Sequence, residues 1–349
     1  MFAILKVSQR QFPKGCQIGS QMKQWIVAPI FLVSLASQAQ ALNEARPFSI
    51  VLLPDAQWYT TAGRAGQPRF FTAQTEWIVQ NKEDLGITLV LQLGDLTDDN
   101  GEASWANASQ SLAVLDGKVP YVIAVGNHDG ISGKDPDTTK FNQAFPQSRF
   151  AATLAGVFEP GQLDNSFHCL QAGGVNWLVL SVEFGPRDAV LSWANQVVEQ
   201  HPTHRVIVVT HAHLYGDDKL QGGDPTHRWT PTSVGRENNP PEFWDKFLRK
   251  HENIAFVFSG HNFEDGQGRL VGTGDHGNKV LQVLCNFQGE PNGGGGFLQV
   301  IRMFPAQDRL EAFTYSPVLD DLRTDGEYAY RYEGLGFFGA PRTASGQCS

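Results

Sequence analysis

Short apolar runs alternate with amphipathic stretches over most of the chain. The runs are rich in β-branched residues and lie at residues 49–53, 87–93, 121–125, 176–182, 205–210 and 254–259. Three stretches between them place their apolar side chains at helical spacing, at residues 70–85, 188–200 and 241–252. Because the runs lack strict alternation and helices separate them, the pattern predicts an α/β core buried on both faces of its sheet.

The C-terminal third has a different pattern. Apolar runs at residues 280–288, 296–304 and 309–315 follow one another with only turn-forming residues between them. This spacing predicts antiparallel strands that complete a second sheet, followed by an irregular tail beyond Pro317. The run of four glycines at 293–296 has no helix after it, which argues against a phosphate-binding loop. No linker interrupts residues 42–349, so we expect one domain there.

Residues 1–41 have the pattern of a leader that contains a signal peptide. A short basic region begins at Met22, an apolar stretch occupies residues 25–36, and a small-x-small cleavage site ends at Ala41. The apolar stretch is too short to span a bilayer comfortably. We therefore expect cleavage after Ala41, a periplasmic or secreted mature protein, and no stable membrane insertion.

Charge and cysteine content narrow the range of partners. The formal net charge is −9 over 349 residues, and the leader carries basic residues but no acids, so the mature chain is more acidic still. Such a surface repels polyanions, which excludes nucleic acid as a favoured partner. Cleavage would leave Cys169, Cys285 and Cys348, which allow at most one internal disulfide of undetermined pairing.

Side chains that can bind metal ions follow five of the apolar runs. Carboxyl ends of strands are where open α/β sheets build their active sites, so we expect these side chains to meet. Carboxylates gathered there would repel one another unless a cation lay between them. Asp, Asn and His suit Zn, Mn or Fe, so the pattern predicts a metal centre. In chain order the runs lead to Asp55 and Gln57, to Asp95, to Asn127, His128 and Asp129, to His211, and to His261.

The order of these motifs resembles that of the calcineurin-like metallophosphoesterases, which include purple acid phosphatases and many secreted phosphodiesterases. The motifs are D-x-Q at residues 55–57, G-D-x-x-D at 94–98, G-N-H-D at 126–129, T-H at 210–211 and G-H at 260–261. The resemblance implies a four-layer α/β sandwich, with two mixed β-sheets flanked by helices. It also implies hydrolysis of a phosphate mono- or diester in a small phosphorylated substrate.

The resemblance further implies two divalent metal ions, with Mn, Fe, Zn and Mg as candidates. Asp95 would bridge them. Asp55 and Gln57 would bind the first ion. The second ion would be bound by Asn127, His211 and His261.

Two further residues have roles implied by the resemblance. His128 would contact the scissile phosphate and help the leaving oxygen to depart, and Asp129 would orient the His128 ring. The nucleophile would be a metal-bound hydroxide that attacks phosphorus in line.

The chain departs from the family pattern at the first ion. Gln57 stands where the family usually has His, and Phe263 stands where the family usually ends G-H-x-H. A glutamine carbonyl can bind a metal ion, but Phe263 cannot, so another group would have to substitute. An oxygen-rich first site would favour Mn, Mg or Ca over Zn. The substitute candidates are Asn262, Glu264, Asp265 and water.

Three functions are consistent with these residues. The first is an exported phosphoesterase with a binuclear centre, and the second is a degenerate one-metal member that acts as a non-catalytic binding module. The third is a metal-dependent hydrolase of non-phosphate esters or amides. Weaker candidates for the substrate pocket or the surroundings of the metals are Trp58, Tyr59, Asp98, Asp99, Trp105 and His213.

Overall fold

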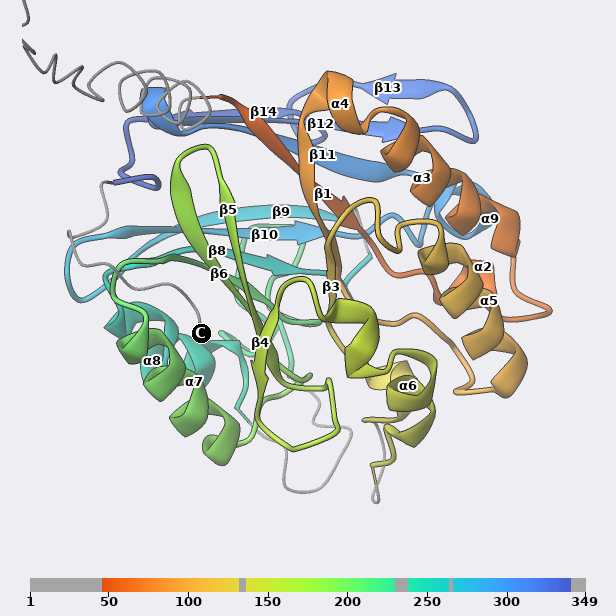
Figure 1. The fold of residues 1–349 in the computed structure, drawn as a ribbon, viewed down its shortest axis with the longest axis horizontal. Helices are drawn as coiled ribbons and strands as arrows, with labels where there is room; N and C mark the ends of the chain where they lie inside the picture. The colour runs from red at the N-terminus through yellow and green to blue at the C-terminus, as the bar shows by residue number, and fades with distance from the viewer. Residues whose placement is uncertain (1–45, 132–135, 230–237, 264–265, 340–349) are drawn as a thin grey trace, which may run out of the picture. The chain divides into compact units, whose positions relative to one another are not determined.

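The apolar runs form the strands of two mixed β-sheets (Figure 1). The computed structural model describes residues 46–131, 136–229, 238–263 and 266–339. These residues belong to one unit that spans Ala41–Ser349. The expected leader lies outside the described residues, as do Glu264 and Asp265.

The first sheet has seven strands within the described ranges, in the order β13-β12-β11-β1-β2-β3, with β14 also paired to β12. Strands β1, β2 and β3 are parallel, whereas β11 to β14 pair antiparallel. The bounds are β1 Phe48–Leu53, β2 Ile87–Gln92, β3 Tyr121–Ile123, β11 Leu298–Phe304, β12 Arg309–Ser316, β13 Asp321–Arg323 and β14 Tyr330–Glu333.

The second sheet also has seven strands in the described part of the chain, in the order β4-β5-β6-β7-β8-β10-β9. Strands β6, β7, β8 and β10 are parallel, and the edge strands pair antiparallel. The bounds are β4 Leu154–Val157, β5 Ser166–Ala172, β6 Val175–Ser181, β7 Arg205–Val209, β8 Ile254–Ser259, β9 Gln267–Thr273 and β10 Lys279–Cys285.

The central strands β1, β7 and β8 are buried on both faces, as the unbroken apolar runs predict, whereas strands toward the sheet edges are partly exposed. Successive side chains of a strand point to opposite faces, so Ile50 of β1 packs toward the second sheet while Val51 packs toward helices. Trp177 and Phe256 of the second sheet meet Ile50 in the layer between the sheets. The four-layer sandwich of two mixed β-sheets flanked by helices is therefore confirmed.

Helices cover the outer face of each sheet (Figure 1). Helices α3 and α5 lie on the first sheet, and α7 and α8 lie on the second. Helix α8 begins at a capping box, in which the Asn239 side chain accepts from the Glu242 N–H and Glu242 bonds back. The bounds are α2 Gln57–Thr60, α3 Pro68–Gln80, α4 Lys82–Leu85, α5 Glu102–Ala113, α6 Thr139–Ala144, α7 Asp188–Gln200, α8 Pro240–Lys246 and α9 Pro291–Gly294.

The C-terminal tail is more ordered than the sequence predicts. Strands β13 and β14 lie beyond Pro317, and Phe337 is fully buried in the layer between the sheets. The Arg205 guanidinium donates to the carbonyl oxygens of Gly336 and Phe337, which ties this segment to β7. The weak periodicity of the tail therefore reflects short strands, not an absence of packing.

The structure describes two of the three cysteines that cleavage of the leader would leave. Cys169 takes part in a disulfide and Cys285 is a free, buried thiol, whereas Cys348 lies outside the described residues. Of the helices that the structure describes, none is both long enough and apolar enough to cross a membrane.

We expect Phe256→Ala to lower the free energy of unfolding by about 3–5 kcal/mol, because it removes a buried ring from the layer between the sheets. Phe256 is fully buried and its ring centroid lies 5.1 Å from that of Phe337. Denaturant unfolding measures the change. The control Leu322→Ala, at an exposed position of β13, should change stability by less than about 0.5 kcal/mol. Equal effects of both substitutions would contradict this account of the core.

Candidate metal centre

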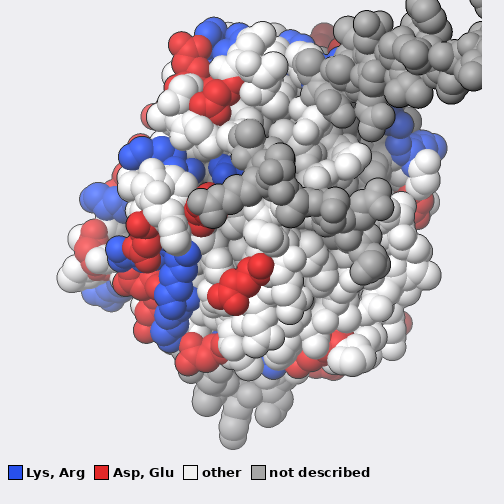
Figure 2. Space-filling model, turned by 60° about the vertical axis from the view of Figure 1, so that its left-hand side comes forward, with Lys and Arg blue, Asp and Glu red and all other residues white. Residues whose placement is uncertain are grey.

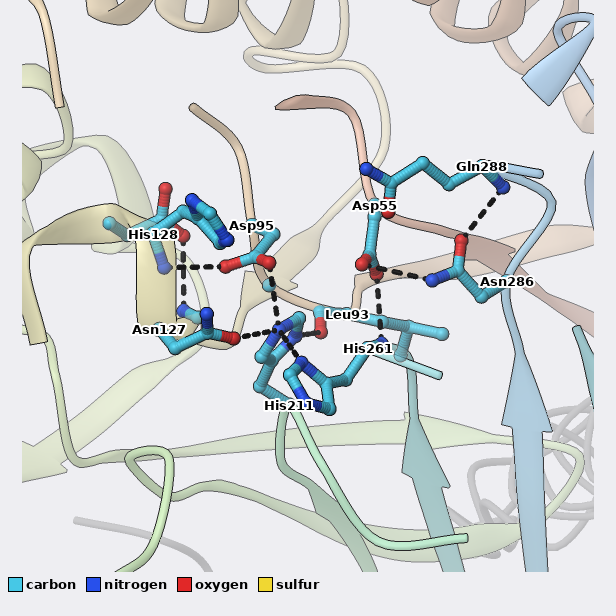
Figure 3. Close-up of polar contacts among 12 residues, drawn as sticks. Asp55, Leu93, Asp95, Asn127, His128, His211, His261, Asn286 and Gln288 are labelled. Carbon is cyan, nitrogen blue, oxygen red and sulfur yellow. Dashed lines mark hydrogen bonds and ion pairs between the residues drawn. The ribbon is translucent and has the colours of Figure 1, made fainter. Parts of the chain in front are cut away.

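The candidate ligands come from the carboxyl ends of strands in both sheets. Asp55 follows β1, Asp95 follows β2 and Asn127 follows β3, all in the first sheet. His211 follows β7 and His261 follows β8 in the second sheet. Figure 3 shows these five side chains gathered in one place, although Asp55 and His261 are 206 residues apart in the chain.

The tightest part of the cluster is formed by Asp95, His211 and His261, whose ligand atoms all lie within 4.8 Å of one another. The His211 Nε2 atom lies 3.1 Å from Asp95 Oδ2 and 3.1 Å from Asn127 Oδ1. The His261 Nδ1 atom lies 3.2 Å from His211 Nε2. The His211 Nδ1 atom lies 2.8 Å from the Leu93 carbonyl oxygen, and this contact points Nε2 into the cluster.

In the metal-free cluster the buried carboxylates need a positive charge to compensate them. Burial would raise the pKa of Asp95, but the charge of His211 and its hydrogen bond lower it below the usual value. Burial lowers the pKa of His211, but Asp95 and Asp55 outweigh this and raise it to about 9. Burial and the charge of His211 lower the pKa of His261 to about 3. In the absence of metal, a protonated His211 therefore supplies one positive charge beside the carboxylates. A divalent ion at this place would supply two.

Asp55 forms a second branch of the cluster. Its Oδ2 atom accepts from Asn286 Nδ2 at 2.9 Å and its Oδ1 atom accepts from the His261 backbone N–H at 3.2 Å. Burial raises the pKa of Asp55 to about 7, against the charge of His211. Sequence analysis missed Asn286, although the N-x-Q motif at the end of β10 repeats the spacing of D-x-Q after β1.

Gln57 lies beside Asp55 in sequence but not on a strand. The sequence predicts that both residues follow the same apolar run. In the structure that run forms β1, which ends at Leu53, and Gln57 is the first residue of helix α2. Its side chain is nonetheless 4% exposed, and its Oε1 atom is buried without a hydrogen-bond partner. A buried carbonyl oxygen without a partner is costly, and a cation would satisfy it.

The side chains present fit divalent ions on these observations. The second site offers a carboxylate, an amide oxygen and two imidazoles. The first site offers Asp55 and the unpartnered Gln57 oxygen. Phe263 contributes no ligand, because a phenyl ring has no donor atom for a divalent ion. The residue is 45% exposed, and its ring packs on Trp58 with centroids 6.0 Å apart. Asn262 is also turned away, since its Nδ2 atom donates to the Leu214 carbonyl oxygen at 2.7 Å.

His128 lies at the edge of the cluster with a partly exposed ring. Its backbone N–H donates to Asp95 Oδ1 at 2.9 Å, and its Nδ1 atom lies 3.0 Å from the Asp98 carbonyl oxygen. The Asp98 carboxylate also lies 3.7 Å from that Nδ1 atom and is paired with Arg64. Asp98, which sequence analysis rated as a weak candidate, is therefore the residue that holds the His128 ring.

Asp129 has a different role from the one expected. We expected it to orient the His128 ring, but its oxygens accept from the backbone N–H groups of Leu96, Thr97 and Gly126 at 2.9–3.1 Å. Burial and the nearby Asp95 charge raise its pKa to about 7. Asp129 thus organises the two loops that carry Asp95 and His128, and acts on the ring only through them.

Two ligands have an uncommon backbone conformation, and two glycines next to the ligands leave space for carboxylates. Asp95 and His261 both have left-handed conformations, with φ of 47° and 72°, which non-glycine residues rarely adopt. A Cβ atom added at Gly126 would collide with the Asp95 carboxylate, and one added at Gly260 would collide with that of Asp55. The glycines in the G-N-H-D and G-H motifs therefore make room for the carboxylates.

Most of the weaker candidates are structural. Tyr59 is buried and its hydroxyl accepts from the Gly296 N–H, while Trp105 packs in the core and donates to Asn100 Oδ1. His213 is fully buried, with Nε2 2.6 Å from Gln282 Oε1. Asp99 accepts from the Gly101 N–H at the start of α5.

Comparison with protein families gives one assignment. The profile of the calcineurin-like phosphoesterases matches residues 49–264, which contain Asp55, Gln57, Asp95, Asn127, His211 and His261. This match covers more than half of the chain.

Two curated proteins are similar in sequence to this chain. The uncharacterized protein YvnB of Bacillus subtilis (strain 168) is 28% identical over 283 residues, which cover 78% of this chain and 20% of that protein. A protein of Arabidopsis thaliana described as probable inactive purple acid phosphatase 9 is 24% identical over 243 residues, which cover 61% of this chain and 36% of that protein. The chain thus spans well under half the length of both relatives.

Two solved structures share the fold. A purple acid phosphatase, PPD1 from seeds of yellow lupin (Lupinus luteus), has a TM-score of 0.54 at 12% identity, covering 87% of this chain and 58% of that one. A dimetal phosphatase from Danio rerio has a TM-score of 0.51 at 14% identity, covering 78% of this chain and 98% of that one. At these identities the likeness establishes the fold alone.

Adding Mn²⁺ to metal-free protein should raise its melting temperature, because the ion would bind the folded cluster and not the unfolded chain. The free energy of unfolding would rise by about 2.7 kcal/mol when the free ion concentration is 100 times the dissociation constant. Calorimetry with and without Mn²⁺ measures it. Asp95→Asn should abolish most of the shift, whereas Asp84→Asn, at an exposed position of α4, should preserve it. An undiminished shift in Asp95→Asn would place the ion elsewhere.

Asp129→Ala should lower the free energy of unfolding of the metal-free protein by about 3 kcal/mol or more, since each buried N–H left without an acceptor costs about 1–3 kcal/mol. Urea unfolding measures the loss. The control is Asp99→Ala, which removes the acceptor of the exposed Gly101 N–H and should cost about 1 kcal/mol or less. Similar losses in the two variants would refute the organising role of Asp129.

Proposed function

Because this chain belongs to the calcineurin-like phosphoesterase family, we propose that it is an exported, metal-dependent phosphoesterase with a binuclear centre. The observation that carries the proposal is the convergence of Asp95, His211 and His261 beside the partly exposed His128 ring. Asp95 would be shared by two ions, and the first of these would also be held by Asp55 and Gln57. The other ion would be held by Asn127, His211 and His261.

Divalent ions bound here would polarise the phosphoryl group and lower the pKa of an attacking water. The protein's own contribution is the orientation of its ligands. The Leu93 carbonyl oxygen holds the His211 ring, and Asn286 together with the His261 N–H holds the Asp55 carboxylate. Asp95 is held through Oδ1, which accepts from the His128 backbone N–H at 2.9 Å, while its Oδ2 atom lies 3.1 Å from His211 Nε2.

His128 is the residue we propose to deliver a proton to the leaving oxygen. Its Nδ1 atom faces the Asp98 carbonyl oxygen, which leaves Nε2 free to approach a substrate. In the protonated ring Nδ1–H donates to Asp98 while Nε2–H donates to the departing oxygen. The Arg64–Asp98 ion pair would keep this carbonyl in place.

The proposed substrate is a small phosphorylated compound and the proposed location is the periplasm or the exterior of the cell. The signal-peptide pattern of residues 1–41 supports export. The formal charge of −9 disfavours long polyanions, nucleic acid included. On the face drawn in Figure 2, Lys and Arg lie among Asp and Glu, an arrangement unlike the continuous basic surface that nucleic acid requires.

The second candidate is a non-catalytic module that keeps one metal ion and binds a partner. The observation that favours it is Phe263, whose exposed ring stands where the family usually has a metal-binding imidazole. The retained His128, which a purely structural ion would not require, favours the enzyme.

With added Mn²⁺ the purified protein should hydrolyse bis- or mono-(p-nitrophenyl) phosphate, and His128→Asn should lower kcat by about 10²–10⁴-fold. Elemental analysis should find the same metal content in His128→Asn as in the wild type, because the proposed ligands do not include the ring. Asp95→Asn should lose both metal and activity. A protein that binds metal but hydrolyses neither ester would support the binding module instead.

A further inference from the structure

Two amide side chains, those of Asn286 and Gln288, follow the end of β10. Strand β10 is parallel to β8, so residues that follow it reach the same edge as His261. Asn286 and Gln288 follow β10 with the spacing that Asp55 and Gln57 have after β1. Asn286 already bonds Asp55, which leaves Gln288 to be explained.

Gln288 is buried although its side-chain oxygen lacks a hydrogen-bond partner. It is 2% exposed, and its backbone N–H donates to Asn286 Oδ1 at 3.0 Å. Its side-chain oxygen Oε1 is buried and has no hydrogen-bond partner. Figure 3 shows the side chain extended from the end of β10 toward Asp55. Burying an amide oxygen without a partner destabilises the folded state, so a ligand bound there would stabilise it.

The Gln57 oxygen is in the same state. Both Oε1 atoms are buried and unpartnered, and each belongs to a residue that flanks Asp55, one through the chain and one through Asn286. Carboxylate and amide oxygens are the ligands that hard divalent ions prefer. Two orphaned carbonyl oxygens beside a buried carboxylate are therefore the donor set of a hard cation.

We propose that Gln288 is a ligand of the first ion and replaces the imidazole that Phe263 does not supply. This inference rests on the proposed metal centre and completes it. The first ion would then be held by oxygens alone, from Asp55, Asp95, Gln57 and Gln288, whereas the second is held largely by imidazoles. The two sites should consequently differ in preference, with Mn²⁺ or Mg²⁺ favoured over Zn²⁺ at the first.

Mn²⁺ titration of metal-free protein, followed by the electron paramagnetic resonance signal of unbound ion, tests the assignment without relying on activity. The wild type should show two sites. Gln288→Met has similar volume but a soft thioether, and should weaken one site about 10- to 100-fold while leaving the other unchanged. The control Gln74→Met removes a buried glutamine of α3, bonded to the Phe297 carbonyl oxygen, and should leave both sites unchanged.

Gln288→Glu provides an independent arm should Gln288→Met not fold. Its carboxylate keeps an oxygen in the same place and adds charge, so the affected site should bind Mn²⁺ more tightly than in the wild type. Unchanged binding in Gln288→Met, or unchanged or weaker binding in Gln288→Glu, would overturn the assignment.

The assignment of Gln288 and the proposed phosphoesterase function can be disproved by different results. A wild type that binds two ions and hydrolyses a phosphate ester, with Gln288 variants that bind as it does, would overturn this inference and leave the proposed function standing. A wild type that binds one ion at most and hydrolyses neither ester would overturn both.

Discussion

Three carboxylates buried within one small region are the constraint on which this centre depends. Asp55, Asp95 and Asp129 are each at most 1% exposed, and the charge of Asp95 raises the pKa of both others. Burial of like charges is costly unless a cation or dense hydrogen bonding compensates. Backbone N–H groups compensate Asp129, whereas the charge of His211 lowers the pKa of both Asp55 and Asp95 without outweighing burial at Asp55. Metal binding follows as the arrangement that relieves the remaining cost.

The two-sheet architecture makes that concentration of charge possible. Parallel strands of each sheet end at a common edge, and the apolar layer between the sheets holds the two edges against each other. His211 and His261 from one sheet thereby reach Asp95 from the other. Contacts to backbone groups hold these ligands, so their geometry is set by the rigid part of the fold and not by mobile side chains.

The sequence predicts the strands well because buried strands are continuous apolar runs, and their polar ends then place the ligands. The sequence predicts less well which short segments are helical and what role each polar side chain has, because both depend on tertiary contacts. Helix α5 has few apolar residues and went unrecognised, and helix α2, which begins at Gln57, was not predicted because its four residues are too few to show a helical period. The role expected of Asp129, orientation of the His128 ring, belongs to Asp98, because only folding shows which of the two residues faces that ring.

Anomalous diffraction from crystals grown with Mn²⁺ tests the central claim most directly, since it locates each ion against its ligands. Our account predicts two peaks. One should lie among Asn127, His211 and His261, the other should lie beside Asp55, and Asp95 should lie between them. A single peak at the imidazoles would contradict the binuclear centre, and the absence of any peak at these side chains would contradict the metal site itself.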